Sequence, residues 1–182
     1  MKILHSVIVV TGVALLYWVF FRLNMLIVAH HSFSTGTDWI FLPSGLRLLF
    51  ILLFVGEGAI GICIASIFIS YAAYFRGDLV TAFGAGLISG FSPLLARFIC
   101  LQYRKLTIGL EGLTGHSLLE IAGIFAVLSA VFHQLWFYWR GISSDFAQSA
   151  VTMIIGDFLG TLLMLYAARL LLGLWGAQKR SR

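Results

Sequence analysis

Six long apolar stretches dominate the chain and limit the folds that it can adopt. They are Ile3–Phe21, Ile40–Val55, Ala59–Phe75, Leu79–Leu101, Leu118–Trp139 and Ala147–Leu172. None of them alternates polar and apolar residues as a barrel strand does, so each is expected to be a helix. A helix of about 20 apolar residues crosses the hydrocarbon core of a bilayer. The sequence therefore predicts an all-α, polytopic transmembrane helical bundle with about six spans.

The composition excludes a water-soluble fold and predicts a single domain. Charged residues make up 10% of the chain and hydrophobic residues 60%, whereas about 25% of the residues of a soluble domain are charged. Lipid must therefore solvate much of the surface. Six spans of about 20 residues would use about 120 residues. We therefore expect one integral membrane domain over residues 1–182, without a separate kinase, cyclase or nucleotide-binding domain.

The second and third apolar stretches are short for a full crossing. We expect them either to be tilted or to form a tight helical hairpin that turns at Gly56-Glu57-Gly58. Pro43 stands at the start of the second stretch, where its missing N–H costs nothing. The first stretch follows Lys2, as in a signal peptide, but it is too long and no small-residue cleavage site precedes Arg22. We expect it to be an uncleaved first span.

The basic residues predict which side of the membrane each loop faces. If both termini are cytoplasmic, the inner side holds Lys2, Arg104, Lys105, Lys179, Arg180 and Arg182, and the outer loops hold Arg22, Arg76 and Arg140. Cytoplasmic loops carry an excess of Lys and Arg, so this bias favours N-in and C-in in a bacterial inner membrane. Aromatic residues fall near the same outer interface, namely Tyr17-Trp18, Trp39, Tyr71, Tyr74 and Trp136–Trp139. Because the basic residues are scattered, no nucleic-acid partner is expected.

Three polar side chains lie deep within the predicted spans, in the half of the membrane predicted to be outer. At 1.5 Å per residue, Arg47 lies about 12 Å below the interface at Trp39, and Asp157 about 15 Å below the start of the last span. His133 lies about 9 Å below the end of its span by the same rise. A charge in hydrocarbon costs about 2.5–3.5 kcal/mol. We therefore expect these three side chains to form one buried polar cluster.

Two interpretations of this cluster remain open. In the first, Arg47 and Asp157 form a structural ion pair that fixes the register of two helices. In the second, the cluster is a ligand, ion or proton site that opens to the outer side. The remaining charges within apolar stretches, Arg97, Glu120 and Arg169, lie near predicted inner ends. We expect them to extend to the membrane interface.

Catalytic and metal-binding patterns are weak. Ser89, with His133 on another helix, is similar to the pair of a six-span intramembrane serine protease, but the rhomboid motif requires glycine where Leu87 stands. His30-His31 and Asp38 offer metal-binding atoms, although such a loop cluster is more often simply solvated. No phosphate-binding loop, dinucleotide motif or zinc helix motif is present. We therefore expect no enzymatic activity, no metal and no cofactor.

Glycine pairs predict close contacts between helices. Gly86 and Gly90 stand four residues apart, as do Gly156 and Gly160, so each pair shares one helix face that a neighbouring backbone can approach. We expect these faces to pack within one chain, with homo-oligomer formation as the alternative. The two cysteines both lie in apolar stretches and are expected to be small buried hydrophobic residues rather than a disulfide.

Two short motifs resemble those of a known family. The first is Leu42-Pro43-Ser44-Gly45-Leu46, which opens an apolar helix, and the second is Ile155–Gly160 in the last span. Together they resemble the first type of the bacterial membrane-associated sensor (MASE-type) domain, over about residues 39–172. The resemblance implies a sensor-like function. It also implies that the family's signature is carried by Pro43, Ser44, Gly45, Gly156, Asp157 and Gly160.

The chain also departs from that family. Members usually have more spans than this chain, and they begin with tryptophan-proline-proline where this chain has Phe41-Leu42-Pro43. Their sensor domains usually feed a cytoplasmic kinase or cyclase domain, which has no counterpart here. If the resemblance holds, any output must therefore pass through a partner protein.

These patterns predict an integral inner-membrane module of the sensor-like or ligand-binding class, without a catalytic domain of its own. It would sit in the lipid bilayer and act through a membrane or cytoplasmic signalling partner. The alternative is a small transporter, or a substrate-binding membrane subunit that an energising partner serves. Accessibility separates the two, because a transporter exposes the region of Arg47 and Asp157 to both sides in turn and a sensor to one side only.

Overall fold

The computed structural model describes residues 2–28, 32–34, 36–104, 114–143 and 145–180. The described elements, in chain order, are α1 (Lys2–Val28), β1 (Ser32–Ser34), β2 (Thr37–Asp38), α2 (Pro43–Ile69), the π-helical turn η1 (Ser70–Tyr74), α3 (Leu79–Arg104), α4 (Gly115–Trp139) and α5 (Phe146–Arg180). The two short strands pair as an antiparallel hairpin. Everything else that is regular in the described residues is helical.

Five helices are long and apolar enough to cross a membrane. The predicted all-α fold of membrane-spanning helices is therefore confirmed, and the predicted number of about six spans is close to the five found. The difference arises because the second and third apolar stretches form one helical unit, Pro43–Tyr74. The hydrophobic pattern alone could not show whether the chain leaves the helix between them.

Helix α2 is broken at Val55, which has φ 45° and ψ −104°. Valine is β-branched and strongly disfavours positive φ, and Val55 is the single non-glycine residue with positive φ in the described part of the chain. A methyl group added at Gly58 would overlap the carbonyl oxygen of Phe50, although eight residues of a straight helix span about 12 Å. The helix therefore folds back sharply, next to the turn predicted at Gly56-Glu57-Gly58.

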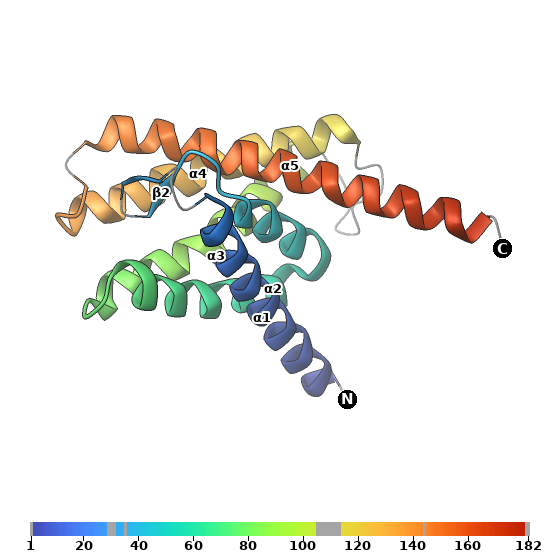
Figure 1. The fold of residues 1–182 in the computed structure, drawn as a ribbon, viewed down its shortest axis with the longest axis horizontal. Coiled ribbons are helices and arrows are strands. Elements are labelled where there is room, and N and C mark those ends of the chain that lie inside the picture. Colours follow the sequence, from blue (N-terminus) through green and yellow to red (C-terminus); the bar gives the residue numbers. More distant parts are fainter. Residues whose placement is uncertain (1, 29–31, 35, 105–113, 144, 181–182) are drawn as a thin grey trace.

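The helices run mostly side by side between two ends of the bundle (Figure 1). One end holds the strand hairpin, the α2–α3 turn and the α4–α5 turn, and is called the hairpin end below. The start of α1 and the end of α5 lie towards the opposite end, while α1 crosses the bundle obliquely (Figure 1). Helix α2 is central, because it contacts α1, α3 and α5.

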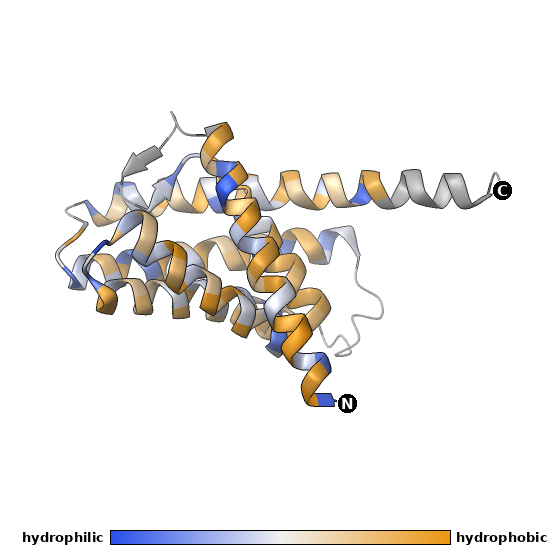
Figure 2. Ribbon diagram, turned by 60° about the horizontal axis from the view of Figure 1, so that its bottom comes forward, coloured by the Kyte–Doolittle hydropathy of each residue, from blue (hydrophilic) through white to orange (hydrophobic). Residues whose placement is uncertain are grey.

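The surface is apolar, as a lipid-solvated protein requires (Figure 2). Leucine, isoleucine, valine and phenylalanine side chains are exposed along all five helices. The interior, by contrast, holds many polar groups; those that matter below are Asn24, Ser44, Arg47, Ser66, Ser89, Ser129, His133, Asp157 and Thr161. A soluble protein distributes these two kinds of side chain in the opposite way.

The two glycine pairs make different contacts. Gly86 and Gly90 lie against Ile67 and Cys63 of α2, so this pair does bring two helices of one chain together. Gly156 lies against the backbone carbonyl of Asp38 in β2, and Gly160 lies against that of Phe41, shortly before α2. Gly160 also lies against Ser44 of α2, so this pair packs within one chain, against both the loop backbone and a helix.

Candidate functional site

The N-terminus of α2 lies inside the bundle rather than at its end. The amide of Phe41 donates to the carbonyl of Gly156 at 3.2 Å, and Gly156 lies ten residues into α5, or about 15 Å from its start. The amide of Leu42 donates to Oδ1 of Asn24 at 3.2 Å. These two contacts serve backbone donors that water would otherwise have to satisfy, so the chain can enter the membrane before the helix begins.

The two family-like motifs meet at this point. The hydroxyl of Ser44 donates to the carbonyl of Asp157 at 2.8 Å, and Thr161 donates to Ser44 at 3.2 Å. A side chain at Gly45 would overlap Met164, and one at Gly160 would overlap the carbonyl of Phe41. Pro43, Ser44, Gly45, Gly156 and Gly160 therefore form a joint between α2 and α5. Their contacts position the neighbouring charged residues.

Arg47 lies one helical turn beyond this joint and is 6% exposed. Its Nε donates to the hydroxyl oxygen of Tyr17 at 2.7 Å. Its guanidinium carbon lies 5.6 Å from the ring centre of Tyr17 and 5.0 Å from that of Phe41, within the range of cation–π attraction. These contacts hold the inner part of the guanidinium, and Nη1 has no hydrogen-bond partner.

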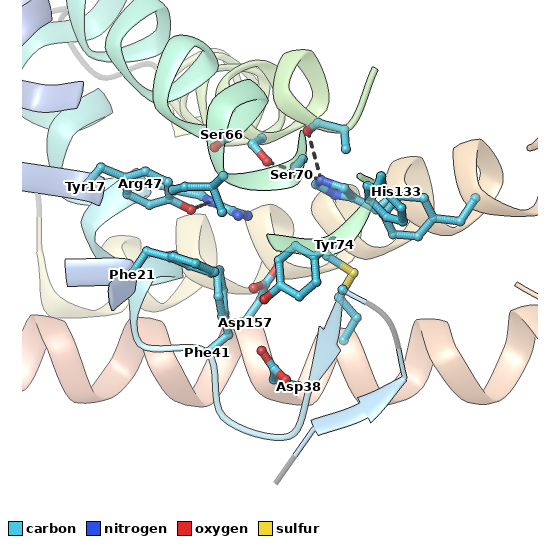
Figure 3. Close-up of a pocket in the computed structure, with 17 residues that line it drawn as sticks. Tyr17, Phe21, Asp38, Phe41, Arg47, Ser66, Ser70, Tyr74, His133 and Asp157 are labelled. Atoms are coloured by element: carbon cyan, nitrogen blue, oxygen red, sulfur yellow. Dashed lines mark hydrogen bonds between the residues drawn. The ribbon is translucent and has the colours of Figure 1, made fainter. Parts of the chain in front are cut away.

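Asp157 faces Arg47 from α5 and is 1% exposed. Its Oδ2 atom has no hydrogen-bond partner. Among the ion pairs of the described residues, none joins Arg47 to Asp157. Both side chains instead line one cavity (Figure 3). The expected polar cluster therefore exists as a set of side chains around a space, and its two charges do not touch.

The cavity has a volume of about 50 Å³. One water needs about 10–15 Å³ on the same measure, so there is room for a few water-sized groups. Its polar lining comes from Tyr17, Asp38, Arg47, Ser66, Ser70, Tyr74, Ser89, His133 and Asp157. These residues come from the β2 strand and from every helix. We call this space the polar cavity.

His133 is 4% exposed and lies on the α3 side of the polar cavity. Its Nδ1 lies 2.8 Å from the carbonyl oxygen of Ser129. A carbonyl only accepts, so Nδ1 donates to Ser129 in the tautomer that carries its proton. Its Nε2 lies 3.3 Å from Oγ of Ser89 and 3.2 Å from the carbonyl of Ala85. Ser89 and His133 are thus in contact, but Nδ1, the nitrogen that a carboxylate binds in a catalytic triad, lies against the backbone carbonyl of Ser129.

Tyr17, Tyr74 and the η1 turn belong to the site, and the sequence did not assign them to it. Tyr17 was expected at the outer interface, but it is 1% exposed because its hydroxyl binds Arg47 inside the bundle. A weak signal was available: Val13, Tyr17 and Phe21 recur every four residues and are the buried stripe of α1. The π-helical turn, with Ser70 and Tyr74 on the cavity, had no sequence signal.

Other expected groups lie elsewhere. His30 and His31 lie outside the described residues, and no group of three or more metal-binding side chains is found in the part that is described. Arg97 is 6% exposed, so it does not reach the surface as expected. Cys63 and Cys100 are free thiols.

Comparison of this chain with family models, with curated proteins and with solved structures finds no match. The resemblance to the membrane-associated sensor domain therefore stays a prediction from the sequence. The chemistry of the polar cavity is the basis on which a function can be argued.

Proposed function

We propose that this protein is a membrane-embedded, sensor-like binding module that takes a small polar ligand into the polar cavity and has no catalytic activity of its own. One observation carries the proposal. Arg47 and Asp157 are each more than nine-tenths buried, each keeps an atom without a hydrogen-bond partner, and both face the same space. Leaving a buried polar group unpaired costs about 1–3 kcal/mol, and a charged one costs more.

A purely structural ion pair would look different. The mutual attraction of two buried charges offsets their desolvation only when the geometry is close and the remaining atoms are hydrogen-bonded. Arg47 and Asp157 lie on the same cavity yet form no ion pair. This arrangement favours an occupant between them over a register-fixing contact. A few ordered waters would satisfy the same atoms, so the test must separate a ligand from water.

The ligand would enter from the hairpin end. Gly36, Asp38 and Phe41 line the polar cavity, and they belong to or adjoin the strand hairpin at that end. If the termini are cytoplasmic and the membrane is a bacterial inner membrane, as the charge bias favours, this end faces outwards. Reporter fusions after Lys105 and Arg182 should then read cytoplasmic, and one after Asp78 external. Opposite locations for Lys105 and Arg182 would overturn this orientation.

Thermal unfolding of the purified protein in detergent tests the proposal. The panel holds small soluble compounds in four charge classes: anions, cations, zwitterions and neutral hydrogen-bonding molecules. At least one should raise the melting temperature of the wild type, because a ligand that binds only the native state stabilises it. Arg47→Gln and Asp157→Asn should lose the effect. The controls Arg76→Gln and Asp145→Asn, at the hairpin end, should keep it. No response in any class would mean that water alone fills the cavity.

The alternative of a small transporter is favoured by a different observation. Helix α2 starts inside the bundle and breaks at Val55, and transporters often build their substrate sites from such discontinuous helices. Thiol labelling of Ser70→Cys, in a chain with both native cysteines replaced by alanine, would decide between the transporter and the sensor. A sensor predicts that an impermeant thiol reagent reaches Ser70→Cys from one side of oriented membranes. A transporter predicts labelling from both sides.

A further inference from the structure

The polar cavity also indicates which charge its ligand carries, on the basis of the binding function proposed above. Three buried atoms of its lining residues have no hydrogen-bond partner, namely Nη1 of Arg47, Oγ of Ser66 and Oδ2 of Asp157, and the two charged groups among them have opposite character. Nη1 of Arg47 donates, and Oδ2 of Asp157 accepts when the carboxyl group is ionised. An occupant that satisfies both must therefore present an acceptor to Arg47 and a donor to Asp157.

A simple ion satisfies only half of this requirement. An anion would pair with Arg47, but it would lie in the same small space as the carboxylate of Asp157 and be repelled by it. A cation would pair with Asp157 and be repelled by the guanidinium. Both repulsions are stronger than in water, because the two side chains are buried and buried charges are poorly screened. A molecule that carries both charges gains both attractions and adds no net charge to the site, whose lining also includes the carboxylate of Asp38.

The contacts of Arg47 suit a carboxylate in particular. Its Nε is already bound to Tyr17, and its flat face lies near the rings of Tyr17 and Phe41. The end of the guanidinium is thus held in one orientation, with Nη1 unpaired. A fixed guanidinium is well suited to a carboxylate, because the two groups are planar and match in shape.

The size of the polar cavity limits the ligand to a few heavy atoms. A volume of about 50 Å³ holds about three to five groups the size of water. Glycine, with two carboxylate oxygens, two carbons and one nitrogen, meets this limit. Phe75 and Phe137 line the same cavity and their ring centres lie 5.3 Å apart. These rings restrict the room for a large side chain and offer a face that an ammonium group tolerates.

We propose that the polar cavity binds a small zwitterion, an amino acid of about the size of glycine, with its carboxylate on Arg47 and its ammonium group on Asp157. The two charges of the ligand replace the direct ion pair that the protein lacks. Larger amino acids are excluded by the walls, and singly charged analogues are disfavoured by the charge that they leave unpaired.

Melting curves of the wild-type protein with matched compounds test this proposal. Glycine carries both charges, acetate only the anion, methylammonium only the cation, urea neither, and leucine is a zwitterion that is too large. Glycine at ten times its Kd should raise the melting temperature by about 3–5 °C. The other four should raise it by less than a third of that amount at equal concentration.

The outcomes separate this inference from the broader function. A response to acetate, methylammonium or urea as large as that to glycine would contradict the proposal that the ligand is a zwitterion. The broader proposal of a binding module would still stand. An equal response to leucine overturns the size limit and the proposal with it. No response to any compound of the larger panel overturns both. Because these tests use the wild type, they hold even if a variant fails to fold.

Two nearly isosteric variants give a second, sharper readout. Asp157→Asn removes the anion and keeps Arg47, so acetate should now stabilise the protein more than glycine does. Arg47→Gln removes the cation and keeps Asp157, so methylammonium should become the best of the series. Arg76→Gln and Asp145→Asn should keep the preference for glycine. Unchanged preference in both cavity variants would show that the ligand binds elsewhere.

Discussion

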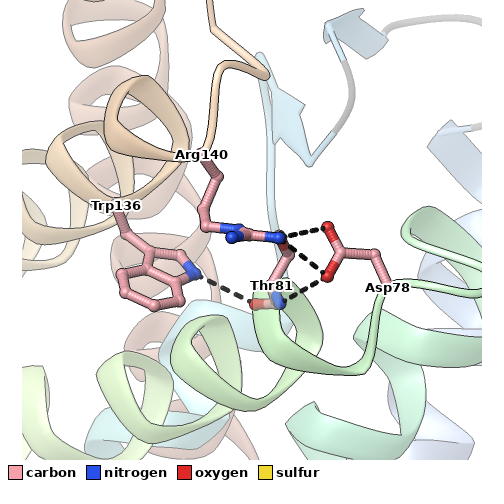
Figure 4. Close-up of polar contacts among 4 residues, drawn as sticks. All are labelled: Asp78, Thr81, Trp136 and Arg140. Carbon is pink, nitrogen blue, oxygen red and sulfur yellow. Dashed lines mark hydrogen bonds and ion pairs between the residues drawn. The ribbon is translucent and has the colours of Figure 1, made fainter.

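Two arginine–aspartate pairs in the described part of the chain differ in burial and in contact. At the hairpin end, Nη2 of Arg140 donates to both carboxylate oxygens of Asp78, at 3.2 and 3.1 Å (Figure 4). Nε of Arg140 donates to Oγ1 of Thr81 at 2.9 Å, and Nε1 of Trp136 donates to the carbonyl of Thr81 at 3.1 Å. Deep in the bundle, Arg47 and Asp157 have no such contact.

The comparison shows that burial alone does not close an ion pair. The pair at the hairpin end is about one-third exposed, where an open pair would cost little because water solvates both groups. It is nevertheless closed, and it ties the start of α3 to the end of α4. The buried pair, for which an open geometry is costly, is the open one. Its guanidinium is bound to Tyr17 of α1 instead.

The largest expected effect comes from removing one partner of the buried pair. Arg47→Ala or Asp157→Ala leaves the other charge buried and should lower the free energy of unfolding by about 3–5 kcal/mol. The double variant should lose less than the sum of the two, because no charge is left alone. Equilibrium unfolding in mixed micelles measures the free energy of unfolding of the two single variants and the double variant. Additive losses would show that the two side chains do not interact across the polar cavity.

A smaller effect is expected at the joint between α2 and α5. Gly160→Leu would overlap the carbonyl of Phe41 and push the loop away from α5, so the protein should lose about 1–3 kcal/mol together with ligand binding. Gly86→Leu, against Ile67, should lose stability through the α2–α3 contact instead. The control is Gly12→Leu, since nothing lies within 4 Å of that position. If Gly160→Leu melted at the same temperature as the wild type, the joint would not contribute to stability.

The smallest effect is expected for the exposed pair and depends on pH. Hydrogen bonds from Thr81, with help from Arg140, lower the pKa of Asp78 from 3.8 to about 2. A lowered pKa stabilises the folded state above pH 3.8, and this contribution is lost as the pH falls through 2. Asp78→Asn should therefore melt slightly below the wild type at pH 7.

The control for this experiment is the difference between the two proteins at low pH. The melting temperatures of wild type and Asp78→Asn should converge as the pH approaches 2. A difference between wild type and Asp78→Asn that stays constant from pH 7 to pH 2 would contradict the assigned role of the carboxylate.

The fold could be predicted from the sequence because it depends on long apolar stretches, and five of its helices carry that signal. The turn predicted at Gly56-Glu57-Gly58 lies next to the break in α2, but the residue that makes the break, Val55, could not be predicted, since no local pattern indicates a valine with positive φ. Counting 1.5 Å per residue from the predicted interface placed Arg47, Asp157 and His133 at similar depths in the membrane. In the structure all three line one cavity. The sequence could not show that Nε of Arg47 would donate to the hydroxyl of Tyr17, because that contact joins residues 30 positions apart.

Helix α5 gives the polar cavity a mechanical connection to the far end of the protein. Asp157 lies on this helix, which continues unbroken to Arg180, about 35 Å further along at 1.5 Å per residue. If this helix moves as a rigid body, a small tilt at Asp157 produces a larger displacement at its far end. A tilt of about 5° around Asp157 displaces the far end by about 3 Å over that length. Sub-ångström adjustments around the carboxylate would thus become movements as large as a hydrogen bond is long.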